Sequence, residues 1–417
     1  MGRAKLVTID RSVEYPRNLG NVVKVTASYH QLWLPSLVTM GKSSSEKQLD
    51  TLLEKVSVRE ICDVYDEQLA ELFLSENAQL YRAPKEVQQA SIASHLDEHY
   101  AGKPSWQLGT WVFYPWNGQL VHLLDQKRFE ALRTIRNKEL ISHDEQEIYA
   151  GIRVGCAGMS VGSGGAVALI LQGASRQIKL ADGAVISGSN LNRIRTGISS
   201  VGLEKSLVVA RQLYEMNPYI TVDRLGKPVT ADSISTFFDE PWPLDVIIDE
   251  IDDLEIKIRL RVEARKRRIP VIMATDLGDD VMLDVERYDQ DPNLPLFHGL
   301  AGNIETVLDR KDMTQRQWLK YATQIIGTKN VPIRMQKSLL LVGTKLPTQP
   351  QLGGTALMAG SVLAYAVRQI ALKGPLKSGR RSVSLDKILL EGATSIRSKL
   401  QHRAHSKALD QAMGSVK

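Results

Sequence analysis

The residues best suited to chemistry lie between positions 152 and 182. A glycine- and serine-rich stretch, residues 158–165 (GMSVGSGG), follows a short apolar run, and Asp182 comes about twenty residues after the first glycine. Small residues let a backbone approach phosphates, a following helix N-terminus offers N–H donors, and an acid at that distance accepts hydrogen bonds from a ribose. The pattern therefore predicts a nucleotide site with Asp182 at the ribose. Its candidate phosphate contacts are Gly158, Ser160, Gly162 and Ser163.

This turn departs from the usual glycine fingerprint. Ser160 and Ser163 occupy the positions where that pattern has its second and third glycines. A strand-to-helix turn that binds no ligand would have a similar composition, so a purely structural turn remains an alternative.

The surrounding sequence predicts the elements that must hold the turn. Residues 152–157 are apolar without alternation, as in a strand covered on both faces, and residues 166–174 are typical of a buried helix. Strands and helices then alternate towards the C-terminus. The predicted strands are 177–182, 244–252, 270–276 and 282–289, and the longer predicted helices are 203–216, 253–268 and an apolar one within 347–374. This order predicts an α/β fold with a doubly wound, mainly parallel Rossmann-like sheet.

A smaller α+β domain is predicted before this sheet. Two strand-like runs flank Asn117 and Gly118, a strong hairpin signal, and residues 48–77, which include Cys62, have helical spacing. The predicted division of the chain is an N-terminal domain over 1–125, a nucleotide-binding domain over 126–374 and a basic C-terminal tail over 375–417.

Composition limits the other classes of function. The net charge is +6, and from residue 373 to 417 ten Lys and Arg face three Asp and Glu, so the excess lies at the C-terminus. This argues against a general nucleic-acid-binding face. No apolar run is long enough to span a membrane and no secretion signal core is evident, so a cytoplasmic location is expected. Cys62 and Cys156 cannot form a four-cysteine zinc site.

Several separate segments add to the nucleotide turn. They are the Arg133, Arg136 and Asn137 cluster, Gln146, the sequence SNLNR at 189–193, Lys205 in GLEK, MNP at 216–218, the pair Asp249 and Asp252, and the small-residue stretch 350–360. Together they resemble the ThiF/MoeB family, which shares the fold of ubiquitin-activating enzymes, over residues 130–374. Members of that family adenylate a carboxylate, commonly the C-terminus of a small ubiquitin-like protein.

The resemblance implies ATP and Mg²⁺ as cofactors and a role for each matching residue. Asp182 would bind the ATP ribose, and Asn190 and Arg193 would contact its phosphates. Asp252 would coordinate Mg²⁺, and Arg136 would reach the site of a partner subunit, which implies a homodimer. The implied catalytic residues are Arg193, Lys205, Asp252 and Arg136, and Lys205 and Arg193 also count among the ATP contacts.

Elementary chemistry supports this set. Attack of a carboxylate on the α-phosphate of ATP requires cations that offset charge repulsion, and a hard cation such as Mg²⁺ on the phosphates. Simpler roles remain open for Arg193 as a loop ion pair, Lys205 as a solvated helix residue and Asp252 as a helix N-cap.

The chain also differs from parts of the family. It has no Cys-x-x-Cys pairs, so no zinc is expected, and no cysteine follows Cys156, so no thioester step is expected. Residues 109–125 and some later segments resemble bacterial proteins that join a ThiF-like domain to a nitroreductase-like domain. The alternatives to adenylation are NAD(H) binding for redox chemistry and a nucleotide-binding scaffold without catalysis.

Overall fold

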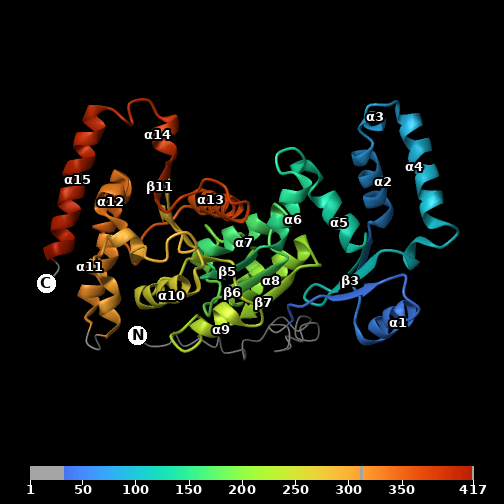
Figure 1. The fold of residues 1–417 in the computed structure, drawn as a ribbon, viewed down its shortest axis with the longest axis horizontal. Coiled ribbons are helices and arrows are strands. Elements are labelled where there is room, and N and C mark those ends of the chain that lie inside the picture. The colour runs from blue at the N-terminus through green and yellow to red at the C-terminus, as the bar shows by residue number, and fades with distance from the viewer. Residues whose placement is uncertain (1–31, 310–312, 416–417) are drawn as a thin grey trace, which may run out of the picture.

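The computed structural model describes residues 32–309 and 313–415 and contains two sheets (Figure 1). The first 31 residues of the predicted N-terminal domain lie outside the described residues. Among the described helices, none combines the length and the apolar composition needed to cross a bilayer.

The larger sheet has seven strands in the order β11-β10-β9-β8-β5-β6-β7. The parallel strands are β5 (Arg153–Ala157), β6 (Gln177–Ala181), β7 (Thr221–Leu225), β8 (Val246–Asp249) and β9 (Val271–Leu277). Two antiparallel strands, β10 (Asp280–Glu286) and β11 (Gly379–Ser384), complete one edge. The prediction of a mainly parallel α/β sheet is therefore confirmed. From β5 the chain adds β6 and β7 on one side, and it then returns to add β8 and β9 on the other side of β5. Ligands of such sheets bind outside the carboxyl ends of the strands at the point where the order reverses.

Helices cover both faces of this sheet. One apolar cluster joins its strands to α7 (Val161–Leu171), α8 (Lys205–Met216) and α13 (Gly353–Ala371). A second cluster joins them to α9 (Ile234–Asp239) and α10 (Leu254–Arg267) on the other face. Helices α7 and α13 touch through glycines, because a Cβ on Gly360 would lie 2.6 Å from the backbone of Gly164. The small residues of both segments therefore serve close helix packing.

The smaller sheet has the order β1-β3-β4-β2. Its strands are β1 (Ser36–Thr39), β2 (Glu60–Asp63), β3 (Thr110–Tyr114) and β4 (Gln119–Leu123), and its helices are α1 (Ser45–Lys55), α2 (Tyr65–Glu76), α3 (Ala78–Tyr81) and α4 (Lys85–Tyr100). The predicted hairpin at Asn117 and Gly118 is confirmed. The helix predicted over 48–77 is wrong in its middle, since Cys62 lies in β2 and pairs with Val121. Pairing with β4 overrides the local helical spacing there.

Aromatic residues attach the smaller sheet to the larger one. The Tyr114 hydroxyl donates to the Tyr214 carbonyl oxygen at 3.2 Å, and Trp116 Nε1 donates to Glu215 at 2.5 Å. Both rings belong to the same apolar cluster as β5 and α7. The chain then continues through α5 (Gln126–Arg133), η3 (Ile135–Asn137) and α6 (His143–Gly151), so the domain boundary near residue 125 stays a prediction.

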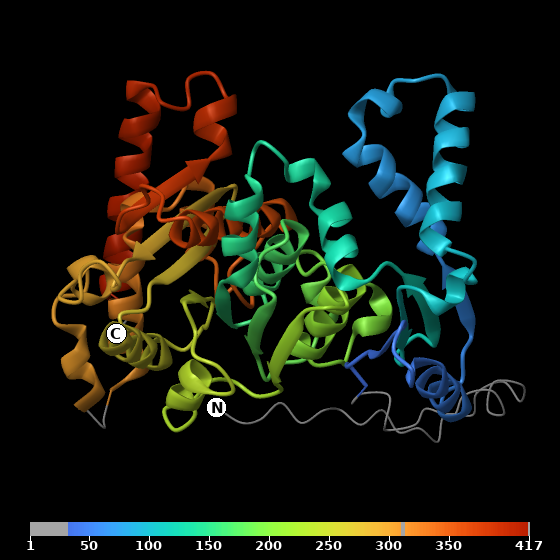
Figure 2. The ribbon, with the colours of Figure 1, turned by 45° about the vertical axis from the view of Figure 1, so that its right-hand side comes forward.

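The C-terminal segment is part of the fold. Strand β11 pairs with β10, and α14 (Leu385–Leu389) leads to α15 (Ile396–Ser415). Helix α15 packs against α11 (Gln315–Ile326) and α12 (Ile333–Leu339), as Figure 2 shows. Residues 379–415 therefore pack against the rest of the chain. Part of their basic charge has internal partners, for example Arg380, which binds Asp284.

Candidate nucleotide site

The turn after β5 has a backbone that requires glycine at its first position. Gly158 has φ +92°, and a Cβ there would lie 2.2 Å from the carbonyl oxygen of Glu250. Its N–H donates to the Ala181 carbonyl oxygen at 2.8 Å, which ties the turn to the end of β6. This approach of three strand ends places the turn at the carboxyl edge of the sheet.

Helix α7 starts earlier than the sequence suggested. It begins at Val161, so only residues 158–160 form the loop, and Gly162 and Ser163 lie in the first helical turn. Ser163 Oγ donates to the Ser160 carbonyl oxygen at 2.7 Å, and a phosphate contact of Ser163 stays a prediction. The prediction of a longer turn over 158–165 is therefore corrected.

Asp182 lies directly beside this turn. One carboxylate oxygen accepts from the Met159 N–H at 2.7 Å, and the other accepts from the Ala184 N–H at 2.6 Å. Each carboxylate oxygen has two lone pairs, so a ribose hydroxyl could still donate to it. The predicted position at the tip of the second strand is confirmed, and its contact with a ribose stays a prediction.

Arg193 reaches the turn from a distant loop. Its Nε lies 3.4 Å from Ser160 Oγ, and its Nη1 donates to the Ser189 carbonyl oxygen at 3.1 Å. Arg193 forms no ion pair within the described ranges 32–309 and 313–415. The structure therefore does not support the alternative in which Arg193 only forms an ion pair in its loop. Asn190 is different, because its Oδ1 accepts from the Ser187 N–H at 3.1 Å and closes a local cap. A phosphate contact of Asn190 remains a prediction.

Lys205 is the first residue of α8. Its backbone N–H donates to the Ala184 carbonyl oxygen at 2.9 Å, and the next residue, Ser206, donates to the Asp182 carbonyl oxygen at 3.2 Å. The start of α8 is thus fixed to the segment that carries Asp182. Lys205 is half-buried and has no acid partner among the residues that the structure describes.

Two acids lie at the carboxyl ends of the neighbouring strands β8 and β9. Asp252 is exposed, and the N-cap of α10 is Asp253, whose side chain accepts from the Ile256 N–H at 3.2 Å. The cap interpretation of Asp252 is therefore wrong. Asp276, near the end of β9, is 7% exposed and accepts from Gln351 Nε2 at 2.9 Å. Burial raises its pKa, the bond from Gln351 and the charge of Arg193 oppose that rise, and Asp252 adds to it. Arg193, Asp252 and Asp276 therefore share one electrostatic environment.

This donor set suits a magnesium ion that comes with phosphates. Within the part of the chain that the structure describes, no group of three or more His, Cys, Asp or Glu could hold a metal. Mg²⁺ usually takes one or two carboxylates and completes its shell with phosphate oxygens and water. Asp252 and Asp276 fit that requirement, and the sequence analysis missed Asp276 although it is an acid at a strand end.

Glu250 lies beneath the turn and was also missed. A Cβ on Gly162 would be 3.4 Å from its Cγ, and its Oε1 accepts from the Ala274 N–H at 2.7 Å. Burial raises the pKa of Glu250 to about 8. A carboxyl that is neutral at physiological pH adds little repulsion against phosphates at this position.

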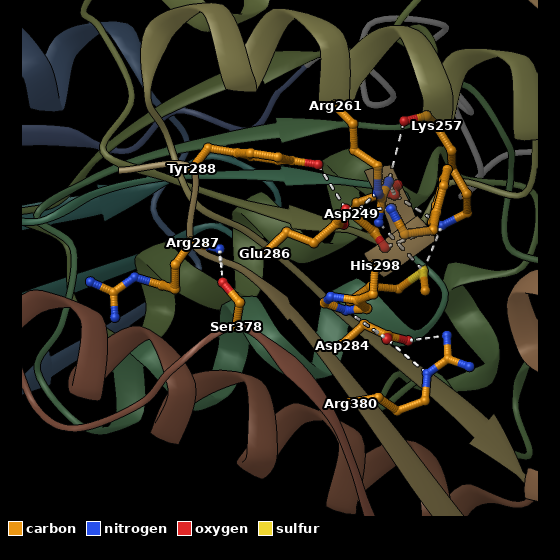
Figure 3. A network of polar contacts seen from close by, with 12 residues as sticks. Asp249, Lys257, Arg261, Asp284, Glu286, Arg287, Tyr288, His298, Ser378 and Arg380 are labelled. Carbon is orange, nitrogen blue, oxygen red and sulfur yellow. Dashed lines mark hydrogen bonds and ion pairs between the residues drawn. The ribbon is translucent and has the colours of Figure 1, made fainter. Parts of the chain in front are cut away.

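A buried ionic network holds the loop between β8 and α10 (Figure 3). Asp249 accepts from Arg261 Nη1 at 2.5 Å and from Lys257 Nζ at 3.1 Å, and Arg261 Nε donates to Glu286 at 2.6 Å. Burial opposes the ionised form of Asp249, but Lys257 and Arg261 together lower its pKa. Asp249 Oδ1 also accepts from the Ile251 N–H at 3.2 Å, so this network positions the loop that carries Asp252.

Arg136 lies apart from these residues in its own chain. It is exposed on η3, where its neighbours Arg133 and Asn137 donate to the carbonyl oxygens of Ile170 and Gln172. These carbonyls end α7, whereas the turn begins it, and eleven residues of helix separate the two ends by roughly 16 Å. Arg136 therefore does not join Arg193 within one chain.

The fold and this arrangement define a class of protein: an α/β domain with a glycine turn, cations and acids from separate segments gathered at the carboxyl edge of the sheet. Residues 133–347, just over half of the chain, match the model of the ThiF family. The chain belongs to the ThiF family.

Two curated proteins are similar in sequence. An uncharacterised protein of Mycobacterium tuberculosis is 38% identical over 280 residues, which cover 67% of this chain and 38% of that protein. The chain thus matches well under half the length of this relative. A tRNA threonylcarbamoyladenosine dehydratase of Bacillus subtilis is 28% identical over 212 residues, covering 49% of this chain and 77% of that protein. Neither match supports the predicted link to nitroreductase-like proteins.

Solved structures show a more distant likeness. Escherichia coli tRNA N6-threonylcarbamoyladenosine dehydratase, TcdA, is 19% identical, with 58% of this chain and 95% of that chain covered and a TM-score of 0.41. Escherichia coli MccB with ATP is 15% identical, with 77% and 83% covered and a TM-score of 0.44. Both likenesses are weak, and nothing about the site rests on them.

Proposed function

We propose that this protein binds Mg·ATP at the carboxyl edge of the large sheet and transfers AMP to a carboxylate, with release of pyrophosphate. The observation that carries the proposal is the position of Arg193, which lies 3.4 Å from Ser160 in the turn and shares the electrostatic environment of Asp252 and Asp276. A cation and two acids beside a glycine turn suit a phosphate group that arrives with its own metal ion.

In this proposal the residues divide the work. The turn and Asp182 hold the ribose and phosphates, and the glycine at 158 lets the backbone come close. Arg193 and Lys205 would offset the negative charge that develops as the carboxylate attacks the α-phosphate. Mg²⁺, when bound, would polarise the phosphates; Asp252, with Asp276, would supply its protein oxygens.

We further propose that two copies of the chain form the working unit. Arg136 is exposed at the opposite end of α7 from its own turn, so it can act only on the site of a second copy. The similarity of Arg133, Arg136 and Asn137 to the family's finger motif supports this homodimer, because the resemblance assigns Arg136 to the partner's site.

The acceptor is proposed only by chemical class: a carboxylate on a protein, peptide or small molecule. We also propose that residues 109–125 are related to bacterial proteins that join a ThiF-like domain to a nitroreductase-like domain. A cytoplasmic location is proposed as well. NAD(H) binding is the weaker alternative, because it leaves Arg193, Lys205 and Asp252 without a purpose. A catalytically inert scaffold would keep nucleotide binding without turnover.

Calorimetric titration with ATP tests the nucleotide part without an acceptor. We expect ATP binding that requires Mg²⁺. Mg·ATP should raise the melting temperature of the protein, and NAD should leave it unchanged. Asp252→Asn should remove the magnesium dependence. The matched control is Asp253→Asn, which removes a neighbouring charge and keeps a good N-cap. Stabilisation by NAD alone would overturn the proposal in favour of the redox alternative.

Pyrophosphate exchange into ATP tests the chemistry once carboxylate acceptors are offered. We expect exchange with an acceptor that is lost in Arg193→Met and Asp252→Asn. Magnesium-dependent ATP binding without exchange for any acceptor class would support the scaffold instead.

A further inference from the structure

A second site is built at the opposite end of the sheet from the nucleotide turn. A cavity of about 740 Å³ opens between α5, η3 and α6, and Gly173, Ala174 and Arg176 border it where the chain enters β6. These residues mark the amino ends of the strands, so the length of α7 separates the cavity from the turn. Its volume lies in the range of pockets that hold small-molecule ligands.

Two of the three acids that line this cavity, Glu130 and Glu147, bind the same arginine, Arg176. Arg176 donates to Glu130 at 2.7 Å and to Glu147 at 2.9 Å, and its Nε also bonds to Glu130. Every nitrogen of this guanidinium therefore has a carboxylate partner. Arg176 closes one wall, and its hydrogen bonds to these two carboxylates use four of its five N–H groups.

The other cations of the cavity lack such partners. Arg133 donates through Nη2 to the Ile170 carbonyl oxygen at 2.7 Å, a contact that caps the C-terminus of α7. Its Nε is buried and has no hydrogen-bond partner among the described residues. Burial lowers the pKa of Arg133, and Glu130 only partly offsets this effect. Lys127 and Lys138 line the same cavity, and neither forms an ion pair within the part of the chain that the structure describes.

We propose that this cavity binds a small anion through a phosphate or carboxylate group held by Arg133, with Lys138 assisting. Arg133 is the reason: its half-buried guanidinium forms one hydrogen bond within the described residues, to Ile170, and an oxyanion in the cavity would accept from its Nη groups and offset its charge. Four cations and three acids line the cavity, and Arg176 holds two of these acids. An anion is therefore the ligand that the remaining charge favours.

Equilibrium dialysis with radiolabelled inorganic phosphate, and in parallel with succinate, tests the proposal. All variants carry the Arg193→Met substitution as well, so that anion binding at the nucleotide turn is the same in every sample. We expect Arg133→Met to weaken binding of one or both anions by about tenfold or more, since a bond to a charged group is lost. The matched control is Arg128→Met, which removes an arginine from the same helix, outside the cavity lining.

Lys138→Met keeps the proposal testable if Arg133→Met fails to fold, because Lys138 is exposed. Phosphate binding alone assigns a phosphoryl ligand and succinate binding alone a carboxylate ligand. Absence of binding for both anions at millimolar concentration, or binding unchanged in both variants, would overturn the site. A dimer that dissociates in Arg133→Met without any anion binding would also overturn it, because the cavity would then receive a second copy.

Discussion

Replacement of Arg261 by methionine should strongly destabilise the large domain. The Arg261 side chain is fully buried and lies between two buried acids, Asp249 at 2.5 Å and Glu286 at 2.6 Å (Figure 3). Its guanidinium also lies 4.0 Å from the ring centre of Phe297. Methionine fills much of the volume but leaves both carboxylates without their shared cation.

The magnitude follows from the cost of an uncompensated buried charge. Removal of one partner from a buried pair typically costs about 3–5 kcal/mol, against a total unfolding free energy of about 5–15 kcal/mol. For a domain of about 150–250 residues this corresponds to a fall in melting temperature of roughly 6–20 °C. Urea unfolding at pH 7 measures the change. Arg259→Met, which removes an exposed i,i+4 pair with Glu255 on the same helix, should stay within about 0.5 kcal/mol of the parent.

The pH dependence gives a second check on the same variant. In the parent the pKa of Asp249 is lowered, so its contribution to stability is present above the unfolded pKa and is lost as pH falls through the folded pKa. Without Arg261, Lys257 is the remaining cation that opposes the effect of burial on Asp249, so the protonated acid is more favoured than in the parent and the variant loses less stability on acidification. The difference between parent and variant should therefore shrink as pH falls from 7 towards about 4.

A compensated variant completes the test. Asp249→Asn and Glu286→Gln together with Arg261→Met remove both charges and should recover much of the lost stability. A loss below about 1 kcal/mol in Arg261→Met, or a difference that does not change with pH, would show that the network is not ionised as described.

Three further outcomes are expected. Gly158→Ala should lower the free energy of unfolding by at least about 1–3 kcal/mol, because φ is +92° and the carbonyl oxygen of Glu250 lies 2.2 Å from the added Cβ. The control is Gly188→Ala, which has open space around it and should leave the free energy of unfolding nearly unchanged in the same urea experiment. The Arg136→Ala and Asp252→Ala variants should each lose pyrophosphate exchange. Mixing and refolding the two variants together should restore part of this activity, because a mixed dimer keeps one intact site. If verified mixed dimers show no recovery, Arg136 does not act in the partner's site. Glu250→Gln should gain stability relative to the parent as pH rises from about 5 to 8. With a folded pKa of about 8, the folded parent must keep a proton on Glu250 that the unfolded chain releases above its own lower pKa. Equal melting temperatures for both proteins across this range would contradict the neutral Glu250.

The local order of the nucleotide turn could be predicted from sequence. Strand β5, the glycine at 158, helix α7 and the acid at 182 form one contiguous stretch, and hydrophobic periodicity with small residues is enough to place them. The Asn117 hairpin is local in the same sense. Short-range geometry and composition decide such features.

Other features depend on contacts between distant segments. Cys62 lies in a strand because β2 finds β4, and residues 379–384 form a strand because β10 offers an unpaired edge. Asp276 and Glu250 belong to the site because β8 and β9 end beside the turn, which no local pattern records.

The sequence by itself therefore determined the strand–turn–helix unit around Gly158, the mainly parallel sheet and most of the candidate residues at the carboxyl edge. Only the tertiary structure decided which of these residues meet: Arg193 joins the turn, Arg136 lies at the far end of α7, and Asp253 rather than Asp252 caps α10. The physical reason is that burial and charge depend on long-range packing, which brings together residues whose separation along the chain carries no signal of their proximity.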